Sequence, residues 1–363
     1  MAEAASSHQR LANEGALKRF VAAVLTKLGV AASDAGTVAD VLVAADLRGI
    51  ESHGVARLES HYAGRLRSGV MNATAAIETV RETSTSILLD AGNGLGHPAG
   101  VRAMNAVMDK ADAEGAAFGA VRNSNHFGIA GYYAMLALER DMIGIASTNS
   151  VRFGAPTFGR DILLGTNPLA FAIPARDEPA FVLDFATTTV PRGKIDVYAR
   201  NEMPLEPGWA VDADGRETTD PQTALRGALL PLGGFGVESG GHKGFGMGLL
   251  VDILCGVFAG GAFGAAAPLP SDGPQPGHVS HFFAAFKIDG FRDPAAFRTD
   301  MDAELRAFKD ARKASGAERI YVAGEIEDET TRERRARGIP VHADVWDGLE
   351  RLARELGIAF ELA

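Results

Sequence analysis

The order in which short strands and helices follow one another is the strongest constraint on the fold of this chain. Three apolar strands are predicted over residues 142–148, 168–173 and 181–185, and loops rich in Gly, Pro and Asn connect them. Strands that alternate regularly with helices are typical of a parallel, doubly wound sheet. Because the elements here lack a regular βαβ rhythm, we expect a mixed α/β fold rather than a plain doubly wound sheet.

Hydrophobic periodicity and turn residues predict the remaining elements. Helices are expected over residues 13–68, 98–114, 132–140 and 249–258, and two polar helices are expected to close the chain. Further strands are expected over residues 86–90, 116–122 and 281–288. Residues 200–235 are predicted to be mostly loop. Ser33 and Asp34 are plausible helix caps, and the strongly apolar helix at 249–258 is expected to be buried.

The composition, with 46% hydrophobic and 23% charged residues, is that of an ordinary soluble globular protein. A length of 363 residues suggests two or three domains. The formal net charge of -10 argues against a nucleic-acid partner, because Lys and Arg are not in excess to neutralise phosphates. Cys255 is the single cysteine, which excludes intramolecular disulfides and thiolate metal clusters, and it is most simply a buried core residue.

Targeting and membrane signals are not found in the sequence. Residues 1–20 lack the apolar core of a signal peptide. No apolar run reaches the roughly 18 residues that a membrane-spanning helix needs. We therefore expect a cytoplasmic protein without a membrane partner.

Residues 46–58, which read DLRGIESHGVARL, bring Ser52, His53 and Arg57 together. Histidine exchanges protons near neutral pH, and the arginine fork matches a carboxylate in bidentate fashion. If a helix resumes near Ser52, that residue can cap it, and His53 and Arg57 lie four apart on one face. The segment then indicates a site that binds a carboxylate and moves a proton beside it. The alternative is a capped surface helix with an ordinary His and Arg.

Two glycine-rich loops come close to phosphate-binding motifs. Residues 92–100, GNGLGHPAG, follow a strand and precede a helix, but His97 stands where a dinucleotide fingerprint needs glycine. We therefore interpret this loop as a structural turn. Residues 233–248 end in GGHKGFGMG and lack the Lys-Ser/Thr pair of a P-loop. Lys243 and the helix start beside it still fit an anion or a cofactor, and a plain tight connection is the alternative.

Polar clusters follow several of the predicted strands. Residues 121–133 place His126 between a strand and a helix, and residues 165–171 and 183–194 place hydroxyls, an Asp and an Arg at strand ends. Strand ends are a usual place for ligands in α/β folds. Each cluster alone can be turn chemistry, and His126 alone can be satisfied by neighbouring backbone. Together they indicate a ligand site.

Five motifs together resemble the malate/L-lactate dehydrogenases of the second type. The motifs are SHGVAR at 52–57, NSNHFG at 123–128, GTNP at 165–168, DFAT at 184–187 with RGK at 192–194, and GGHKGFG at 240–246. They occur in the family's order over residues 13–340. That family is unrelated to the Rossmann dehydrogenases. It includes dehydrogenases or reductases for ureidoglycolate, sulfolactate, diketogulonate and cyclic imino acids.

The resemblance implies a mixed α/β fold with a largely antiparallel cofactor-domain sheet and a helical domain from both chain termini. Residues 1–75 with 295–363 are expected to form the helical domain, and residues 76–125 with 195–294 the nicotinamide-cofactor domain. Residues 126–194 are expected to form a third domain that contributes to the cofactor and substrate site. The resemblance also implies a homodimer whose active sites lie where subunits and domains meet.

The resemblance further implies roles for individual residues. By this resemblance, His53 matches the family's proton donor to the substrate carbonyl or imine, and Ser52 matches the polarising partner of that donor. Arg57 matches the residue that clamps the substrate carboxylate. His126 matches an alternative catalytic base. Substrate-binding positions are matched by Thr166, Arg192 and Gly193. Positions that hold NAD or NADP are matched by His126, Phe127, Gly128, Ile129, Ala130, Ser150, Asp184, Phe185, Ala186, Lys243, Gly324 and Glu325. No metal is expected, because the nine histidines show no spacing such as HExxH.

The chain departs from the family pattern at two places. Gly324 and Glu325 are followed by Ile326, where relatives often have Gly-Glu-Arg. The arginines at residues 330–337 either touch a cofactor phosphate or alternate with acids on a solvated helix. The threonines at 187–189 replace an Ala-Thr-Ser run, which is a mild change on the substrate side.

The function that follows is an NAD(P)-dependent dehydrogenase or reductase of a small 2-oxo/2-hydroxy acid such as malate or lactate. The nicotinamide carries the hydride, and the protein adds positioning and charge stabilisation. A cyclic imine reductase that uses the same residues is the alternative. A nucleotide enzyme that binds phosphate through residues 233–248 is a third hypothesis, although no magnesium carboxylate set accompanies that loop. The sequence leaves the choice between NAD and NADP open.

Overall fold

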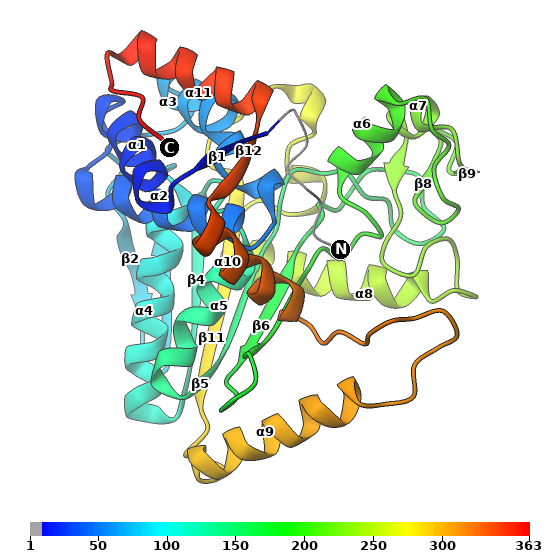
Figure 1. Ribbon diagram of the computed structural model, residues 1–363. Helices are drawn as coiled ribbons and strands as arrows, with labels where there is room; N and C mark the ends of the chain where they lie inside the picture. Colours follow the sequence, from blue (N-terminus) through cyan, green and yellow to red (C-terminus); the bar gives the residue numbers. More distant parts are fainter. Residues whose placement is uncertain (1–8) are drawn as a thin grey trace.

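A seven-stranded sheet forms the centre of the computed structural model, which describes residues 9–363 (Figure 1). The strand order is β2 (Glu78–Glu82), β3 (Ser86–Asp90), β4 (Ala116–Ser124), β11 (Val279–Lys287), β5 (Met142–Thr148), β6 (Leu169–Ile173) and β7 (Phe181–Phe185). Only β3 and β4 pair in parallel, and the five other pairs are antiparallel. The prediction of a mixed α/β fold with a largely antiparallel sheet is therefore confirmed.

Helices α4 (Gly96–Glu114) and α5 (Ala130–Leu136) pack on the sheet and enclose one apolar core with it. The parallel pair β3–β4 exists because α4 supplies the crossover between these two strands. Small residues let α5 approach β5 closely: a Cβ on Gly144 would lie 2.1 Å from the carbonyl oxygen of Ala134. This close packing fixes the chain around residues 125–131, which enter α5 from the end of β4.

A second core joins the two ends of the chain. It contains helices α1 (Glu14–Lys27), α2 (Ala32–Leu47) and α11 (Ala343–Leu356), and the two-stranded sheet of β1 (Gln9–Ala12) and β12 (Ile339–His342) closes it. Figure 1 shows these elements together at one side of the large sheet. The expected helical unit from both termini is thus present.

The remaining elements surround the large sheet. The helices are α3 (Gly64–Arg67), α6 (Arg192–Arg200), α7 (Pro221–Ala224), α8 (Gly241–Asp252), α9 (Pro294–Lys309) and α10 (Glu325–Arg337). A small sheet has the order β10 (Ala228–Leu229), β8 (Ala210–Val211) and β9 (Glu217–Thr218). Short 3₁₀ or π turns are η1 (Glu51–His53), η2 (Val55–Arg57), η3 (Leu58–Ala63), η4 (Ala137–Arg140), η5 (Ile253–Val257), η6 (Gly264–Ala266) and η7 (Pro270–Asp272).

Several predictions about individual elements are wrong. Ser33 and Asp34 do not cap a helix, because α2 begins at Ala32 and both residues lie within its first turn. The helix expected over 249–258 begins eight residues earlier, at Gly241, and continues into η5. It is not buried in this chain, since Leu250 and Val257 are each 51% exposed and Phe258 is 65% exposed. Apolar character alone does not distinguish a core helix from one with an exposed apolar face.

Other elements are missed altogether. Strand β2 has five exposed residues and lies at the sheet edge, so no alternation marks it. Residues 200–235 contain the three short strands of the small sheet and α7, and three helices rather than two close the chain. Cys255 is fully buried as expected, and burial raises the pKa of its thiol to about 12.

The predicted division into domains stays a prediction, and the large sheet combines strands from two of the expected segments. β2, β3 and β4 come from residues 76–125, whereas β5, β6 and β7 come from residues 126–194. Among residues 9–363, no helix is both long enough and apolar enough to cross a membrane. Residues 1–8, which belong to the N-terminal segment without a signal-peptide pattern, lie outside the described residues.

Candidate active site

The segment that carries Ser52, His53 and Arg57 is a pair of 3₁₀ turns, not the resumed helix that was expected. η1 and η2 are separated by Gly54, so Ser52 caps no helix. Its hydroxyl instead lies 2.9 Å from Nδ1 of His53. Arg57 Nε donates to the carbonyl oxygen of Ser52 at 2.8 Å. The three residues are therefore held together by contacts among themselves.

A buried carboxylate fixes the turn between η1 and η2. Oδ2 of Asp46 accepts a hydrogen bond from the backbone N–H of Val55 at 2.9 Å. A Cβ on Gly54 would lie 1.9 Å from Oδ1 of the same side chain, so only glycine fits there. Burial raises the pKa of Asp46 to about 7. Arg334 of α10 donates to the backbone oxygen of Asp46 and forms an ion pair with Glu51.

His126 joins this segment from the other side. The rings of His53 and His126 are stacked with their centroids 5.4 Å apart, and His61 approaches the ring of His126 at 5.4 Å as well. The hydroxyl of Tyr62 lies 2.6 Å from Nδ1 of His126 and 3.2 Å from Nε2 of His97. The predicted site residues His53, His126 and Arg57 thus come together. Three further residues surround them: His61, Tyr62 and His97.

All four histidines of this cluster are held neutral by burial. Loss of water lowers the pKa of His53 to about 4, and those of His61 and His97 to about 3. The pKa of His126 is lowered well below its ordinary value by the same cause, and the neighbouring histidines add to it. Arg57 further disfavours protonation of His53. The cluster therefore presents neutral imidazoles next to a guanidinium at neutral pH.

Sequence reasoning missed His61, Tyr62 and His97. His61 and Tyr62 lie in η3, a π turn. Its irregular spacing gives no apolar stripe from which the orientation of these side chains could be predicted. The sequence singled out His97 only because it stands where a dinucleotide-binding motif needs glycine. Gly96 beside it is required by close packing, because a Cβ there would lie 2.2 Å from the carbonyl oxygen of Asn125. This contact places His97 next to the segment that carries His126.

The residues after His126 are packed, and they reach Asp184. Phe127 is buried and stacks on the ring of His281 with centroids 4.4 Å apart. Gly128, Ile129 and Ala130 are buried too. Oδ2 of Asp184 accepts the backbone N–H of Gly131 at 2.7 Å, and burial raises the pKa of Asp184 to about 6.

Phe185 and Ala186 continue from Asp184 as half-buried residues at the end of β7. Arg48, at the end of α2, counters the raised pKa of Asp184 through its charge. The proposed cofactor positions 184–186 therefore adjoin the proposed positions 126–130 through the contact of Asp184 with Gly131.

Five further predicted residues lie apart from the histidine cluster: Ser150, Thr166, Arg192, Gly193 and Lys243. The hydroxyl of Ser150 accepts the backbone N–H of Thr166 at 3.1 Å. Arg192, at the start of α6, donates to the carbonyl oxygen of Leu225 at 2.9 Å, and Gly193 beside it is exposed. Lys243 is exposed in the first turn of α8. Within residues 9–363, no hydrogen bond or salt bridge joins this group to the histidine cluster.

Gly324 and Glu325 lie at the start of α10. A Cβ on Gly324 would lie 2.9 Å from the backbone nitrogen of Val182 in β7, so glycine is needed for this approach. Glu325 is buried and receives bonds from Lys309, Arg319 and the backbone of Val322. Its carboxylate already ties α9 to α10, and its expected contact with the cofactor stays a prediction.

The glycines of residues 233–248 are also explained by close packing. A Cβ on Gly241 would lie 2.0 Å from the carbonyl oxygen of Gly234, and one on Gly244 would lie 2.0 Å from that of Leu232. Gly240 adopts a φ of 91° directly before α8. The loop is thus folded tightly against the start of α8, which leaves Lys243 beside it at the surface.

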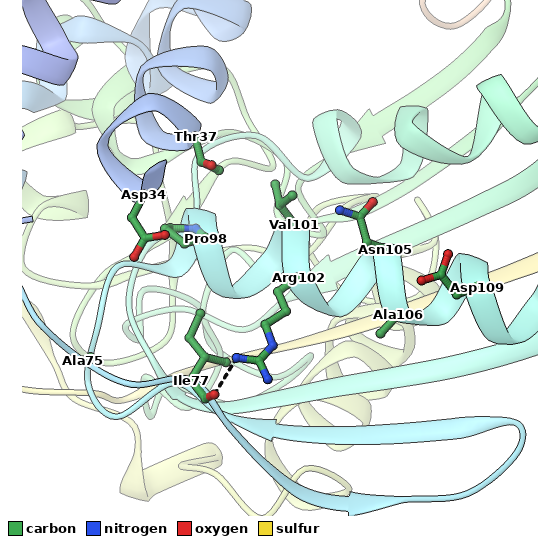
Figure 2. A pocket seen from close by; sticks show the side chains of 10 residues that line it. All are labelled: Asp34, Thr37, Ala75, Ile77, Pro98, Val101, Arg102, Asn105, Ala106 and Asp109. Carbon is green, nitrogen blue, oxygen red and sulfur yellow. Dashed lines mark hydrogen bonds between the residues drawn. The ribbon is translucent and has the colours of Figure 1, made fainter. Parts of the chain in front are cut away.

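A surface groove lies apart from the histidine cluster. Figure 2 shows it between α2 and α4, with a volume of about 590 Å³. Arg102, one of its lining residues, donates to the carbonyl oxygen of Ile77 at 2.6 Å. None of the predicted site residues lines this groove. No group of three His, Cys, Asp or Glu arranged to hold a metal occurs in the described part of the chain.

Comparison with known proteins identifies the family. A family model described as malate/L-lactate dehydrogenase matches residues 13–350. The chain belongs to this family. It is 44% identical to a malate dehydrogenase of Pyrococcus abyssi over 93% of both chains, and 36% identical to an L-sulfolactate dehydrogenase of Methanocaldococcus jannaschii over 95% of this chain and 96% of that one.

Solved structures agree with this membership. The malate dehydrogenase of Pyrococcus horikoshii superposes with a TM-score of 0.89 at 39% identity, and the match covers 99% of each chain. A delta1-piperideine-2-carboxylate reductase of Pseudomonas syringae superposes with a TM-score of 0.83 at 26% identity, covering 95% of this chain and 100% of that one. This chain thus belongs to a family of hydroxy-acid dehydrogenases. An imine reductase has a fold similar to that of this chain.

Replacing Asp46 by Asn tests the buried carboxylate behind the His53 segment. The folded protein raises the pKa of Asp46 to about 7, whereas the unfolded chain keeps a value of about 3.9. Between these values the folded state holds a proton that the unfolded state has lost, so stability falls as the pH rises. We expect the free energy of unfolding of the wild type, relative to that of Asp46→Asn, to fall by several kcal/mol over this range and then stay level.

Urea unfolding curves across that pH range measure this difference. Asp40→Asn is the matched control, because Asp40 lies on the same helix with its side chain 53% exposed. The control is expected to show no comparable slope. A wild-type advantage over Asp46→Asn that grows with pH would contradict the assignment of a protonated, buried Asp46.

Proposed function

We propose that this protein is an NAD(P)-dependent oxidoreductase that transfers a hydride between nicotinamide and a small 2-oxo/2-hydroxy acid. The observation that carries the proposal is the meeting of His53, His126 and Arg57. Neutral imidazoles beside a guanidinium suit a substrate whose carboxylate must be clamped next to a carbonyl that gains or loses a proton. Membership of the malate/L-lactate dehydrogenase family supports the same class of substrate.

Arg57 is the proposed carboxylate clamp. Its Nε donates a hydrogen bond to the carbonyl oxygen of Ser52. Its two terminal nitrogens make no hydrogen bond or salt bridge within residues 9–363. A planar guanidinium with free terminal N–H groups binds a carboxylate in bidentate fashion. The bond to Ser52 orients this fork next to His53, so the clamped acid would present its 2-oxo group to the imidazole.

His53 is the proposed proton donor and acceptor, and Ser52 is its partner. The serine hydroxyl at 2.9 Å from Nδ1 holds the ring and can either donate or accept there. Both tautomers of His53 are therefore supported, which suits a group that gains and loses a proton during turnover. Ser52 is exposed, so protons reach this pair from solvent.

The described residues fit a nicotinamide dinucleotide, which when bound supplies the hydride. Lys243 is exposed, makes no salt bridge within residues 9–363 and lies in the first turn of a 12-residue helix, where an anion is favoured. Asp184 and the backbone of residues 128–131, which the bond from Gly131 joins, would contact another part of such a cofactor. Ser150 and Thr166, whose hydroxyls lie 3.4 Å apart, would supply further hydrogen bonds.

We also infer a homodimer. The apolar residues Leu250, Ile253, Val257 and Phe258 are exposed and lie at positions i, i+3, i+7 and i+8, from α8 through η5 to its C-cap. An exposed stripe of this kind marks an interaction surface more often than a solvated one. A second copy of the chain is the occupant that the family resemblance favours.

A cyclic imine reductase is the second candidate, favoured by the similarity to the piperideine-carboxylate reductase. Arg57 and His53 would serve a C=N bond beside a carboxylate as well as a C=O bond. Assays of 2-oxo acids and cyclic imino acids side by side, with each reduced nicotinamide, distinguish the two candidates.

Substitution of the two central residues tests the proposed chemistry. His53→Ala is expected to lower kcat about 10²- to 10⁴-fold, because the proton donor is lost. Arg57→Ala is expected to lower kcat/KM about tenfold to a hundredfold, because a charge-assisted bond to the carboxylate is lost. Arg67→Ala is the control, since Arg67 forms a surface pair with Glu355. Near wild-type turnover in both site variants, with unchanged melting temperatures, would overturn the proposal.

Cofactor preference is tested by thermal unfolding with NADH, NADPH and ATP with magnesium in parallel. One reduced nicotinamide is expected to stabilise the protein by about 2.7 kcal/mol at roughly a hundredfold excess over its Kd. Lys243→Ala should reduce that stabilisation, whereas Lys27→Ala at the exposed end of α1 should not. Stabilisation by ATP with magnesium alone would instead favour the phosphate-binding nucleotide enzyme.

The dimer is tested by sedimentation of a variant with charges in the apolar stripe. Leu250→Glu combined with Phe258→Glu is expected to sediment as a single chain, because two carboxylates would be buried without partners. Phe291→Glu is the control, since Phe291 is 85% exposed and lies outside the stripe. A wild type that sediments as a single chain would contradict the dimer.

A further inference from the structure

Three hydrogen bonds connect His97, Tyr62, His126 and Gly128 in one chain. Nε2 of His97 lies 3.2 Å from the hydroxyl of Tyr62, and that hydroxyl lies 2.6 Å from Nδ1 of His126. The backbone N–H of Gly128 also points to Nδ1 of His126, at 3.3 Å. Tyr62 and His97 are fully buried, so these bonds are sheltered from exchange with water.

The bond from Gly128 sets the direction of the whole chain. A backbone N–H can only donate, so Nδ1 of His126 must present its lone pair and carry no proton. Tyr62 must then donate its hydroxyl proton to Nδ1. Because that hydroxyl has only one proton, its contact with His97 requires His97 to donate from Nε2.

An independent observation agrees with this assignment. Nδ1 of His97 is buried and has no hydrogen-bond partner in the described part of the chain. With the proton on Nε2, the unpartnered atom is an acceptor. With the opposite tautomer it would be a buried N–H without a partner, which native structures tolerate less readily. Both ends of the chain of bonds therefore demand the same proton positions.

The proton of neutral His126 then lies on Nε2. This atom has no hydrogen-bond partner within residues 9–363. Unlike Nδ1 of His97, it is not enclosed. It is thus an accessible donor on a ring that stacks against His53. His53 differs in this respect, because its partner Ser52 is a hydroxyl that supports either tautomer.

We propose that Tyr62 and His97 are positioning residues that fix His126 as its Nε2–H tautomer, so that His126 donates a hydrogen bond to the substrate oxygen. Proton exchange is left to His53. The fixed tautomer stands on the geometry alone, whereas its role toward substrate rests on the proposed function. A donor aimed where negative charge develops on oxygen stabilises the transition state without itself losing a proton.

Nitrogen-15 NMR of the histidine rings in the substrate-free protein tests the tautomer directly. Protonated and unprotonated ring nitrogens resonate in separate ranges, and loss of one signal set in His126→Gln identifies His126. In the wild type we expect the proton on Nε2 and an unprotonated Nδ1. A wild type with the proton on Nδ1 would overturn the proposal without any variant being needed.

Tyr62→Phe removes the donor to Nδ1 at nearly constant volume. We expect this variant to acquire a measurable population of the Nδ1–H tautomer of His126. Tyr133→Phe is the matched control, because Tyr133 is an equally buried tyrosine whose hydroxyl donates to the carbonyl oxygen of Phe127 and to no histidine. The control should keep the wild-type tautomer. An unchanged His126 spectrum in folded Tyr62→Phe would show that Tyr62 does not position the ring.

Kinetics of the same variants separate this proposal from the proposed function. Tyr62→Phe is expected to lower kcat about tenfold with little change in KM, because the donor to the transition state is present only part of the time. The expected tautomer in a wild type without nicotinamide-dependent activity would refute the function and leave the positioning intact. Nicotinamide-dependent activity in a wild type whose His126 carries its proton on Nδ1 would refute the positioning and leave the proposed function intact.

Discussion

His281 connects the sheet to the candidate active site. It lies fully buried on the central strand β11, and its two ring nitrogens bond the hydroxyls of Thr148 on β5 and Ser124 on β4, each at 2.8 Å. Its ring stacks on Phe127, the residue that follows His126. Because three strands and this stack meet at one imidazole, the end of β4 is fixed, and with it the direction from which His126 enters the site.

Burial of ionisable groups governs the chemistry that the site can perform. Burial keeps the histidines around His126 neutral, and it also raises the pKa values of Asp46 and Asp184. Positive charge is supplied by arginine, which stays protonated where histidine does not. The proposed function divides the roles accordingly: Arg57 binds the carboxylate, His53 exchanges the proton and His126 donates a hydrogen bond.

Much of the sheet is predictable from the sequence, whereas the site is predictable only in part. Strands such as β5 and β7 are short apolar runs between turn residues, so their bounds follow from local pattern. The family resemblance selects both His53 and His126 as candidate site residues, whereas their stacking is seen only in the structure. Tyr62 and His97 are brought together only by tertiary packing, which no local spacing records. The exposure of α8 could not be predicted either, because an exposed apolar face and a buried core have the same hydrophobicity.

The pairing of β1 with β12 has a consequence for the order of folding. The two strands come from opposite ends of the chain, and Arg334 and Arg351 of the C-terminal helices bond Asp46 and Glu59 on either side of the His53 segment. During synthesis the N-terminal helices leave the ribosome long before these partners exist. The turns that carry His53 therefore gain these supports only when translation is complete, so a nascent or C-terminally truncated chain carries the residues of the candidate site without its architecture.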